Sequence, residues 1–191
     1  MKRISLLTVI LIFNFCFSQK KELRKAQKLY DSGDIPGASQ ILTENQTLFE
    51  NSGQKIKPNY DFLRGKIAQN NKEFKEAFDL FNSVKEVVSI KDKVLQQLNI
   101  LSADIVNSAI DDNGSGNFKS STEKLYLAYL IDPEFSKDYL YFAASSAVNA
   151  EMFDVALRYY IQLKEMDYTG VVTKYYVTEI ESGVETEVTE S

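Results

Sequence analysis

Residues 61–84 have the sequence DFLRGKIAQNNKEFKEAFDLFNSV, which combines the features of two consecutive helices. In the second half, apolar residues fall at helical spacing at Phe74, Ala77 and Phe81, which is typical of a helix with one buried face. Gly65 stands nine residues before Phe74, and its small size lets two antiparallel helices approach closely. The stretch therefore predicts a helix pair joined by a tight turn.

The same spacing occurs in four segments of the chain. A small residue is followed after nine positions by a large apolar one, after three more by a small one, and after four more by a large apolar one. One helix pair cannot bury its apolar faces alone, so stacked pairs are expected to share a continuous core. The four sets are Ala26, Ile35, Ala38 and Leu42; Gly65, Phe74, Ala77 and Phe81; Ala109, Phe118, Ser121 and Leu125; and Ala144, Phe153, Ala156 and Tyr160.

This pattern resembles the tetratricopeptide repeat (TPR) family. Gly33-Asp34-Ile35 with Ala38 is similar to the turn and second-helix start of that family, and Gly65 to its first-helix glycine. Leu125, Ala128 and Ile131-Asp132-Pro133 are similar to the end of its repeat. The resemblance covers residues 19–168 and implies an all-α fold, an α-solenoid of about four TPR-like antiparallel helix pairs.

The sequence departs from the family pattern in several places. It has no tryptophan, and Asn45 stands where a small residue is usual. The four segments are separated by 39, 44 and 35 residues, counted from Ile35, Phe74 and Phe118. The extra residues are expected in a linker over 51–57 and in a long helix near residues 92–101, so the predicted superhelix is irregular.

Residues 169–191 differ from the rest of the chain and predict a short β-hairpin. Ser182-Gly183 is a turn signal between two stretches rich in β-branched and aromatic residues. An isolated hairpin is marginal in water, so it is expected to lean on the last helix or on another chain. The alternative is a frayed tail. The strand-forming residues are Val171, Val172, Tyr175, Tyr176, Val177 and Ile180 before the turn and Val184, Thr186 and Val188 after it, the last three alternating with Glu185 and Glu187.

Residues 1–18 have the features of a secretory signal peptide. Lys2 and Arg3 precede an apolar stretch over residues 4–17, and Cys16 and Ser18 supply small residues at positions −3 and −1 of a cut near Ser18-Gln19. Two alternatives are lipidation at Cys16, which Phe15 disfavours because that chemistry needs a small preceding residue, and an uncleaved anchor. The expected location is extracytoplasmic, in the periplasm or secreted.

Composition excludes several function classes. The formal net charge is −5, and no dense basic run follows Lys28, which argues against nucleic acid and against anionic lipid. Membrane contact is expected only through the leader or a partner. The chain has no histidine, and its single cysteine is Cys16, so histidine-based catalytic triads and thiolate metal sites are excluded. No phosphate-binding glycine loop occurs, so neither an enzyme nor a small-molecule cofactor is expected.

In the TPR family the first helix of each pair lines a concave face along which partners bind. The resemblance implies that twelve residues of this chain contact a partner. Amide and hydroxyl groups beside exposed aromatic rings suit recognition of a peptide backbone. The alternative is that these are ordinary solvated positions. The candidates are Gln27, Tyr30, Asp31, Asn59, Phe62, Lys66, Gln69, Asn70, Asp138, Tyr141, Ser145 and Asn149.

Three further features have simpler interpretations. Nine of the eleven tyrosines lie between Tyr126 and Tyr176, where helix packing is favoured over an aromatic binding face. Residues 111–117 resemble the opening of a calcium loop, but Thr122 stands where the required carboxylate belongs, so a helix end and turn are expected. Glu73 and Glu76, beside Lys72 and Lys75, are expected on a solvated helix face.

The sequence thus predicts a non-enzymatic protein–protein interaction scaffold of the cell envelope that binds a partner segment on its concave face. The alternative is a structural assembly module that self-associates or pairs through its C-terminal hairpin. The absence of an evident polar capping helix after the fourth pair favours that alternative, and it also fits the front part of a longer repeat array.

Overall fold

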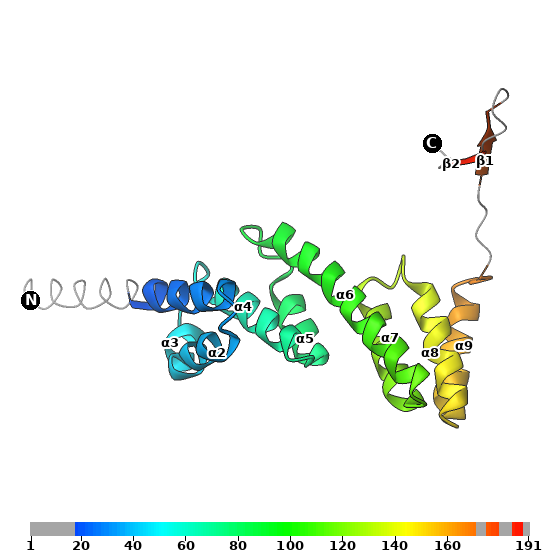
Figure 1. Cartoon of the computed structure of the whole chain (residues 1–191), viewed down its shortest axis with the longest axis horizontal. Helices are drawn as coiled ribbons and strands as arrows, with labels where there is room; N and C mark the ends of the chain where they lie inside the picture. The colour runs from blue at the N-terminus through cyan, green and yellow to red at the C-terminus, as the bar shows by residue number, and fades with distance from the viewer. Residues whose placement is uncertain (1–17, 171–174, 180–184, 189–191) are drawn as a thin grey trace, which may run out of the picture.

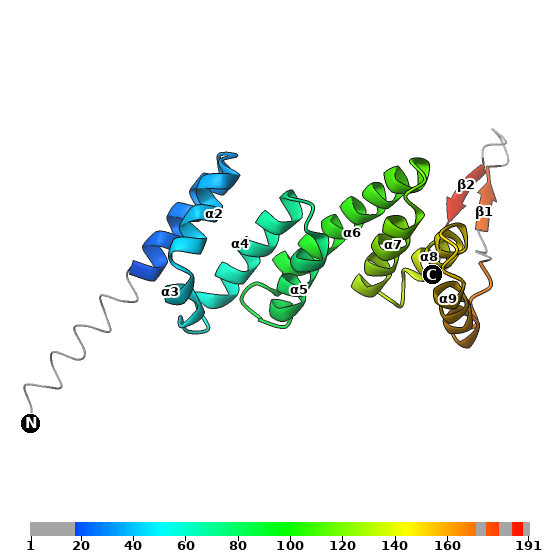
Figure 2. The same cartoon turned by 90° about the horizontal axis from the view of Figure 1, so that it is seen from below.

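The computed structural model describes residues 18–170, 175–179 and 185–188. These residues are all-helical apart from two short strands near the C-terminus. Figure 1 shows the helices side by side in one elongated row, and Figure 2 shows the same order from below. The helices are residues 18–31, α2 (Ile35–Glu44), α3 (Gln46–Glu50), α4 (Lys57–Asn70), α5 (Phe74–Val84), α6 (Lys91–Gly114), α7 (Phe118–Ile131), α8 (Lys137–Asn149) and α9 (Phe153–Glu165).

Helices that are adjacent in the sequence pack against each other, as the spacing of small and large residues predicts. At Gly65, α4 approaches α5 closely. A Cβ atom added at Gly65 would lie 2.5 Å from Cε1 of the Phe81 ring, so only glycine fits there. Ala109 and Leu125, which hold the corresponding positions on α6 and α7, share one buried cluster. The small residue of each pair therefore marks a real helix contact.

Five turns among the described residues have the same hydrogen-bond pattern; one, at Asp167, follows α9, and each of the other four precedes the second helix of a predicted pair. The residue two positions before that helix has a positive φ of 88° at Gly33, 63° at Lys72, 78° at Gly116 and 58° at Glu151. Its N–H donates to the carbonyl three residues earlier, and the next N–H donates to the carbonyl five residues earlier, with N···O distances of 2.8–3.1 Å. These bonds form a Schellman motif, which satisfies the last carbonyls of the preceding helix.

The segment after the first turn departs from a regular helix pair. Asp34 caps α2, because its Oδ1 accepts a 2.9 Å hydrogen bond from the Gly37 N–H. α2 then ends at Glu44, and α3 begins after Asn45, whose side-chain Nδ2 donates to the Ile41 carbonyl at 2.9 Å. The predicted linker occupies residues 51–56, since α4 already begins at Lys57.

α6 contains the extra residues predicted near residues 92–101 and has 24 residues. Its apolar stripe at Val94, Leu98, Leu101 and Ile105 is buried in the largest core cluster, together with Phe81 and other residues of α5. The long helix therefore links the second and third predicted pairs through one core.

The two strands, β1 (Tyr175–Thr178) and β2 (Glu185–Val188), pair antiparallel with Tyr175 opposite Val188 and Thr178 opposite Glu185. The predicted turn at Ser182-Gly183 lies outside the described residues. Figure 1 shows both strands apart from α9, so the expected packing of the hairpin on the last helix is not seen in the described part of the chain.

The predicted signal peptide lies almost entirely outside the described residues. Ser18 and Gln19 are already helical, and Gln19 is buried and donates from its Nε2 to the Leu48 carbonyl at 3.1 Å. Among the residues that the structure describes, no helix is both long and apolar enough to cross a membrane.

Candidate functional site: a surface for protein binding

The first-helix candidates near the N-terminus contact one another, although Asp31 remains exposed. The Lys66 Nζ lies 4.2 Å from the centre of the Tyr30 ring, which joins α4 to the 18–31 helix by a cation–π contact. The Gln27 Nε2 donates to the Asp31 Oδ1 at 2.8 Å. Tyr30 is half-buried against the N-terminal core, and this burial raises the pKa of its hydroxyl. Tyr30 and Lys66 are therefore engaged between two helices, whereas the Gln27–Asp31 bond lies on the surface.

Two candidates on α4, Phe62 and Gln69, pack against neighbouring helices. Phe62 is partly buried, with its ring centre 5.6 Å from that of Phe81. Gln69 is 8% exposed. Its Nε2 donates to the Asp104 Oδ2 at 2.6 Å, and its Oε1 accepts from the Gln97 Nε2 at 2.7 Å. Both ends of the Gln69 amide thus tie α4 to α6, because a buried amide requires partners for both of its polar atoms.

The remaining polar candidates are spread along the array and are not brought together. Asn59 donates from its Nδ2 to the Lys55 carbonyl at 3.2 Å. Asn70 and Asn149 are exposed, and Ser145 is half-buried. They lie on α4 and α8, which the elongated row keeps apart (Figure 1).

Asp138 and Tyr141 are the two candidates that the structure places in one pocket. This pocket, which we name the end pocket, has a volume of about 860 Å³ and lies between α8, α9 and the segment that follows α9. The Tyr141 ring centre is 5.6 Å from Phe142, 6.3 Å from Tyr160 and 6.1 Å from Tyr168. The full lining is Asp138, Tyr141, Phe142, Tyr160, Leu163, Lys164, Asp167, Tyr168, Thr169 and Gly170.

The aromatic rings of the end pocket are uncovered, unlike their counterparts in the other helix pairs. Tyr160 is 39% exposed, whereas Phe81 and Leu125, at the same place in the repeated spacing, are 0% and 6% exposed. Tyr141 is 42% exposed, although Phe62 at the corresponding first-helix position packs on the core. Tyr160 was predicted to pack against a neighbouring helix, and that prediction is wrong for the exposed part of its side chain. The reason is that no helix follows α9 among the described residues to cover Tyr160.

A hydrogen bond fixes one wall of the end pocket. The Tyr168 hydroxyl donates to the Asp138 Oδ1. This bond to the carboxylate, together with partial burial, raises the pKa of Tyr168 to about 12. Tyr168 therefore stays protonated at neutral pH and holds the carboxylate beside the exposed rings. The pocket offers aromatic faces and negative charge together, which suits an apolar side chain flanked by a cation.

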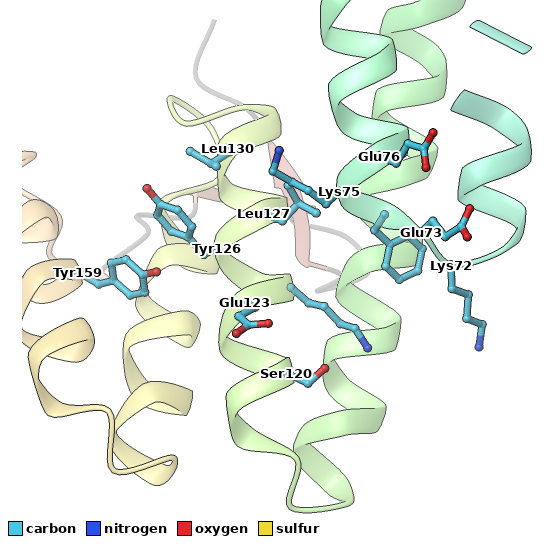
Figure 3. A pocket seen from close by; sticks show the side chains of 12 residues that line it. Lys72, Glu73, Lys75, Glu76, Ser120, Glu123, Tyr126, Leu127, Leu130 and Tyr159 are labelled. Atoms are coloured by element: carbon cyan, nitrogen blue, oxygen red, sulfur yellow. The ribbon is translucent and has the colours of Figure 1, made fainter. Parts of the chain in front are cut away.

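Sequence reasoning missed a second hollow on the side of the second helices. A groove of about 610 Å³ lies between the start of α5 and α7, with Tyr159 of α9 at one end (Figure 3). Its walls are apolar, from Phe74, Tyr126, Leu127, Leu130 and Tyr159, and its rim carries Lys72, Glu73, Lys75, Glu76, Ser120, Glu123 and Lys124. The predicted solvated face at Glu73 and Glu76 is indeed exposed, but it borders this groove.

Much of the charge on the groove rim is already paired. Glu76 accepts from the Arg64 guanidinium at 2.9 Å. Lys124 Nζ is 2.6 Å from the Asp112 Oδ2 and 2.8 Å from the Ser108 Oγ. The groove lies between α5 and α7, which α6 connects. The unusual length predicted for that helix, which implies irregular spacing of the helix pairs, was the sequence feature that could have indicated the groove.

The acidic segment at residues 111–117 is a helix end and turn, as expected. Asp111 to Gly114 complete α6, and Gly116 supplies the left-handed residue of the turn. Asp112 bonds to Lys124 and to the Ser120 hydroxyl, and these bonds lower the pKa of its carboxyl group. Within the described residues no cluster of three acidic, cysteine or histidine side chains is placed to hold a metal ion.

Tyr126 and Tyr159 pack between helices, as was predicted for most tyrosines of this region. Their rings stack with centres 4.7 Å apart and join α7 to α9.

A search of the whole chain against models of protein families matched none of them. A comparison with curated proteins likewise found no match.

Proposed function

We propose that this chain is a non-enzymatic interaction scaffold of the cell envelope, an α-solenoid of four TPR-like helix pairs that binds a segment of a partner protein. The four Schellman turns within the predicted pairs support the repeat interpretation, because a positive φ and the same hydrogen bonds recur two residues before each second helix. The expected extracytoplasmic location belongs to the same proposal and rests on the leader sequence.

The observation that carries the binding proposal is the cluster of uncovered aromatic rings in the end pocket. Tyr141, Phe142 and Tyr160 expose 42%, 52% and 39% of their surface. Tyrosine is enriched among the residues that dominate the energy of protein interfaces, because it supplies a large contact area with few rotatable bonds. Their counterparts in the preceding pairs are covered by a neighbouring helix, so the end pocket is a surface of the kind that a helix covers elsewhere in this protein.

The charged residues that line the end pocket indicate which kind of partner segment it suits. Asp138 and Asp167 line the pocket, and Lys164 is the single cation that lines it. The whole chain carries a net charge of −5. A partner segment that presents an apolar anchor next to lysine or arginine therefore gains both aromatic and electrostatic contacts. Rim charges of this kind act mainly on the association rate and its salt dependence.

The test is to select binders from a displayed peptide library with residues 19–191 as bait and to measure their affinities for variants. Tyr141→Ala is expected to weaken binding about 30-fold, the loss typical of a hot-spot tyrosine. Val88→Ala is the control, because Val88 is 92% exposed and lies between α5 and α6, away from the pocket. Equal affinities of both variants for every selected peptide would refute the end pocket as the binding site.

The same experiment also tests the prediction from the sequence that the partner binds on a concave face along the first helices. Asn70→Ala changes an exposed candidate on α4 that lies outside the end pocket. If Asn70→Ala weakens binding and Tyr141→Ala does not, the partner lies along the first helices rather than at the end of the array.

A further inference from the structure

The outer face of α9 carries a stripe of apolar side chains that nothing in the described structure covers. Phe153, Leu157 and Ile161 are 62%, 59% and 46% exposed, and they fall on one side of the helix at 100° per residue. In α5, which has the same place in its pair, Phe74 is 7% exposed because α6 packs beside it. We name this surface, together with Asp154 and Lys164, the α9 stripe.

The two ends of the array differ in polarity. Among the described residues, large exposed apolar side chains begin only at Val88, and the 18–31 helix has none. That helix instead exposes Lys20, Lys21, Arg24, Lys25 and Lys28. Docking of this basic end on the α9 stripe would bury lysines against apolar groups, which is unfavourable. The surface chemically closest to the α9 stripe is therefore the same stripe on a second copy.

We propose that two copies of this chain associate through their α9 stripes in an antiparallel, two-fold symmetric contact. The charges of α9 are arranged for such a contact about an axis near Tyr159. Leu157 and Ile161 are each two residues from Tyr159, so each lies opposite the other in the second copy. Asp154 and Lys164 are each five residues from Tyr159, so the same register pairs opposite charges at both ends.

The contact closes on itself and stops at a dimer. A two-fold interface uses the same patch on both copies, so it leaves the polar N-terminal ends free and does not propagate. α9 has 13 residues and is thus about 20 Å long, which gives an interface smaller than the standard size of stable complexes. The dimer is therefore expected to depend on concentration, with dissociation in the micromolar range of ~10–100 µM.

This inference goes beyond the proposed function, because it assigns a second surface with a different partner. The end pocket adjoins the α9 stripe at Tyr160 and Lys164, whereas Asp154 and Leu157 lie outside the pocket. Peptide affinity measured on an Asp154 variant therefore reports on the pocket separately from self-association.

The experiment is sedimentation velocity on residues 19–191 over a range of concentrations. Wild type is expected to shift from monomer to dimer as the concentration rises. Leu157→Glu is expected to remain monomeric at the highest concentration and to keep the wild-type melting temperature, because Leu157 is exposed. A wild type that stays monomeric throughout, or a Leu157→Glu variant that dimerises like wild type, overturns the proposal.

A charge exchange tests the register. Asp154→Lys places two lysines opposite each other, and Lys164→Asp places two aspartates opposite each other, so each single variant is expected to dimerise at least five-fold more weakly. The double variant restores opposite charges and dimerisation. An equimolar mixture of the two single variants is expected to form a mixed dimer, since both of its contacts join unlike charges. Failure of both the double variant and the mixture to dimerise refutes the antiparallel register.

The hairpin is the competing contact between copies. Val177 lies in β1 and is 56% exposed, and Val177→Pro removes a backbone donor from that strand. If Val177→Pro abolishes dimerisation while Leu157→Glu leaves it intact, the copies pair through their strands and the α9 proposal is wrong.

Discussion

The turn before α9 contains a glutamate in a backbone conformation that favours glycine. Glu151 has φ 58°, is exposed and occupies the place that Gly33 and Gly116 hold in two of the other turns. A side chain with a Cβ atom costs about 1–2 kcal/mol in this left-handed region. Glycine avoids that cost but loses about 0.4–1 kcal/mol through the greater entropy of the unfolded chain. Glu151→Gly is therefore expected to raise the free energy of unfolding by about 0.5–1 kcal/mol.

Urea and thermal denaturation of residues 19–191, followed by circular dichroism, measure this effect. A gain of that size raises the melting temperature of a chain of this length by about 1–4 °C. Glu151→Ala separates loss of the glutamate side chain from relief of the backbone, because alanine keeps the Cβ atom, and it is expected to leave the stability nearly unchanged. Gly116→Ala is the reverse experiment and is expected to destabilise by about 1 kcal/mol, although open space surrounds Gly116. A Glu151→Gly variant less stable than wild type would refute the equivalence of the turns.

Three other substitutions test the core and one ion pair. Gly65→Ala is expected to lower the free energy of unfolding in a urea titration by about 1–3 kcal/mol, because the new Cβ atom would overlap the Phe81 ring. Gly53→Ala is the control, because a Cβ atom at Gly53 meets open space, and its stability is expected to be nearly that of wild type. Ser121→Ala is expected to stabilise by about 1 kcal/mol, since the Ser121 hydroxyl is buried without a hydrogen-bond partner; a lower urea midpoint would contradict this. The pKa of Asp112 is lowered in the folded chain, so its carboxylate contributes stability above the unfolded pKa of about 3.9 and loses it as the pH falls through the lower folded value. Asp112→Asn is accordingly expected to reduce the free energy of unfolding at pH 7 and to match wild type in the most acidic buffers. An equal loss of stability at both pH values would show that the carboxylate charge of Asp112 does not stabilise the fold.

The spacing of small and large residues was sufficient to predict the helix pairs. Gly65 was singled out for close helix approach, and the structure places it against Phe81. A tight turn was predicted between the two helices of each pair, and glycine marks it at Gly33 and Gly116. Lys72 and Glu151 adopt the same conformation, but their side chains give no local signal of it. Their geometry follows from the pairing of the flanking helices, which is a tertiary effect.

The proposed binding surface was harder to predict than the fold, because a helical pattern identifies the apolar side of a helix without showing what lies against it. Phe62 and Gln69 were assigned to a partner-binding face, yet Phe62 packs against Phe81 of α5 and Gln69 bonds to two residues of α6. Tyr160 was assigned to packing, yet it is exposed because no described helix follows α9. In each case the outcome depends on a neighbouring element and not on the residue itself.

The same effect of neighbouring elements explains why both proposed surfaces lie on α8 and α9, the last helices among the described residues. In a stacked array each pair buries its apolar side against the next one, so the sequence of every pair carries an apolar side whether or not a next pair follows. The 18–31 helix exposes basic side chains, whereas α8 and α9 expose large apolar ones. Exposed apolar area of this kind favours association, and a polar capping helix would remove it. The retained rings of the end pocket and the α9 stripe therefore point to binding at this end of the molecule.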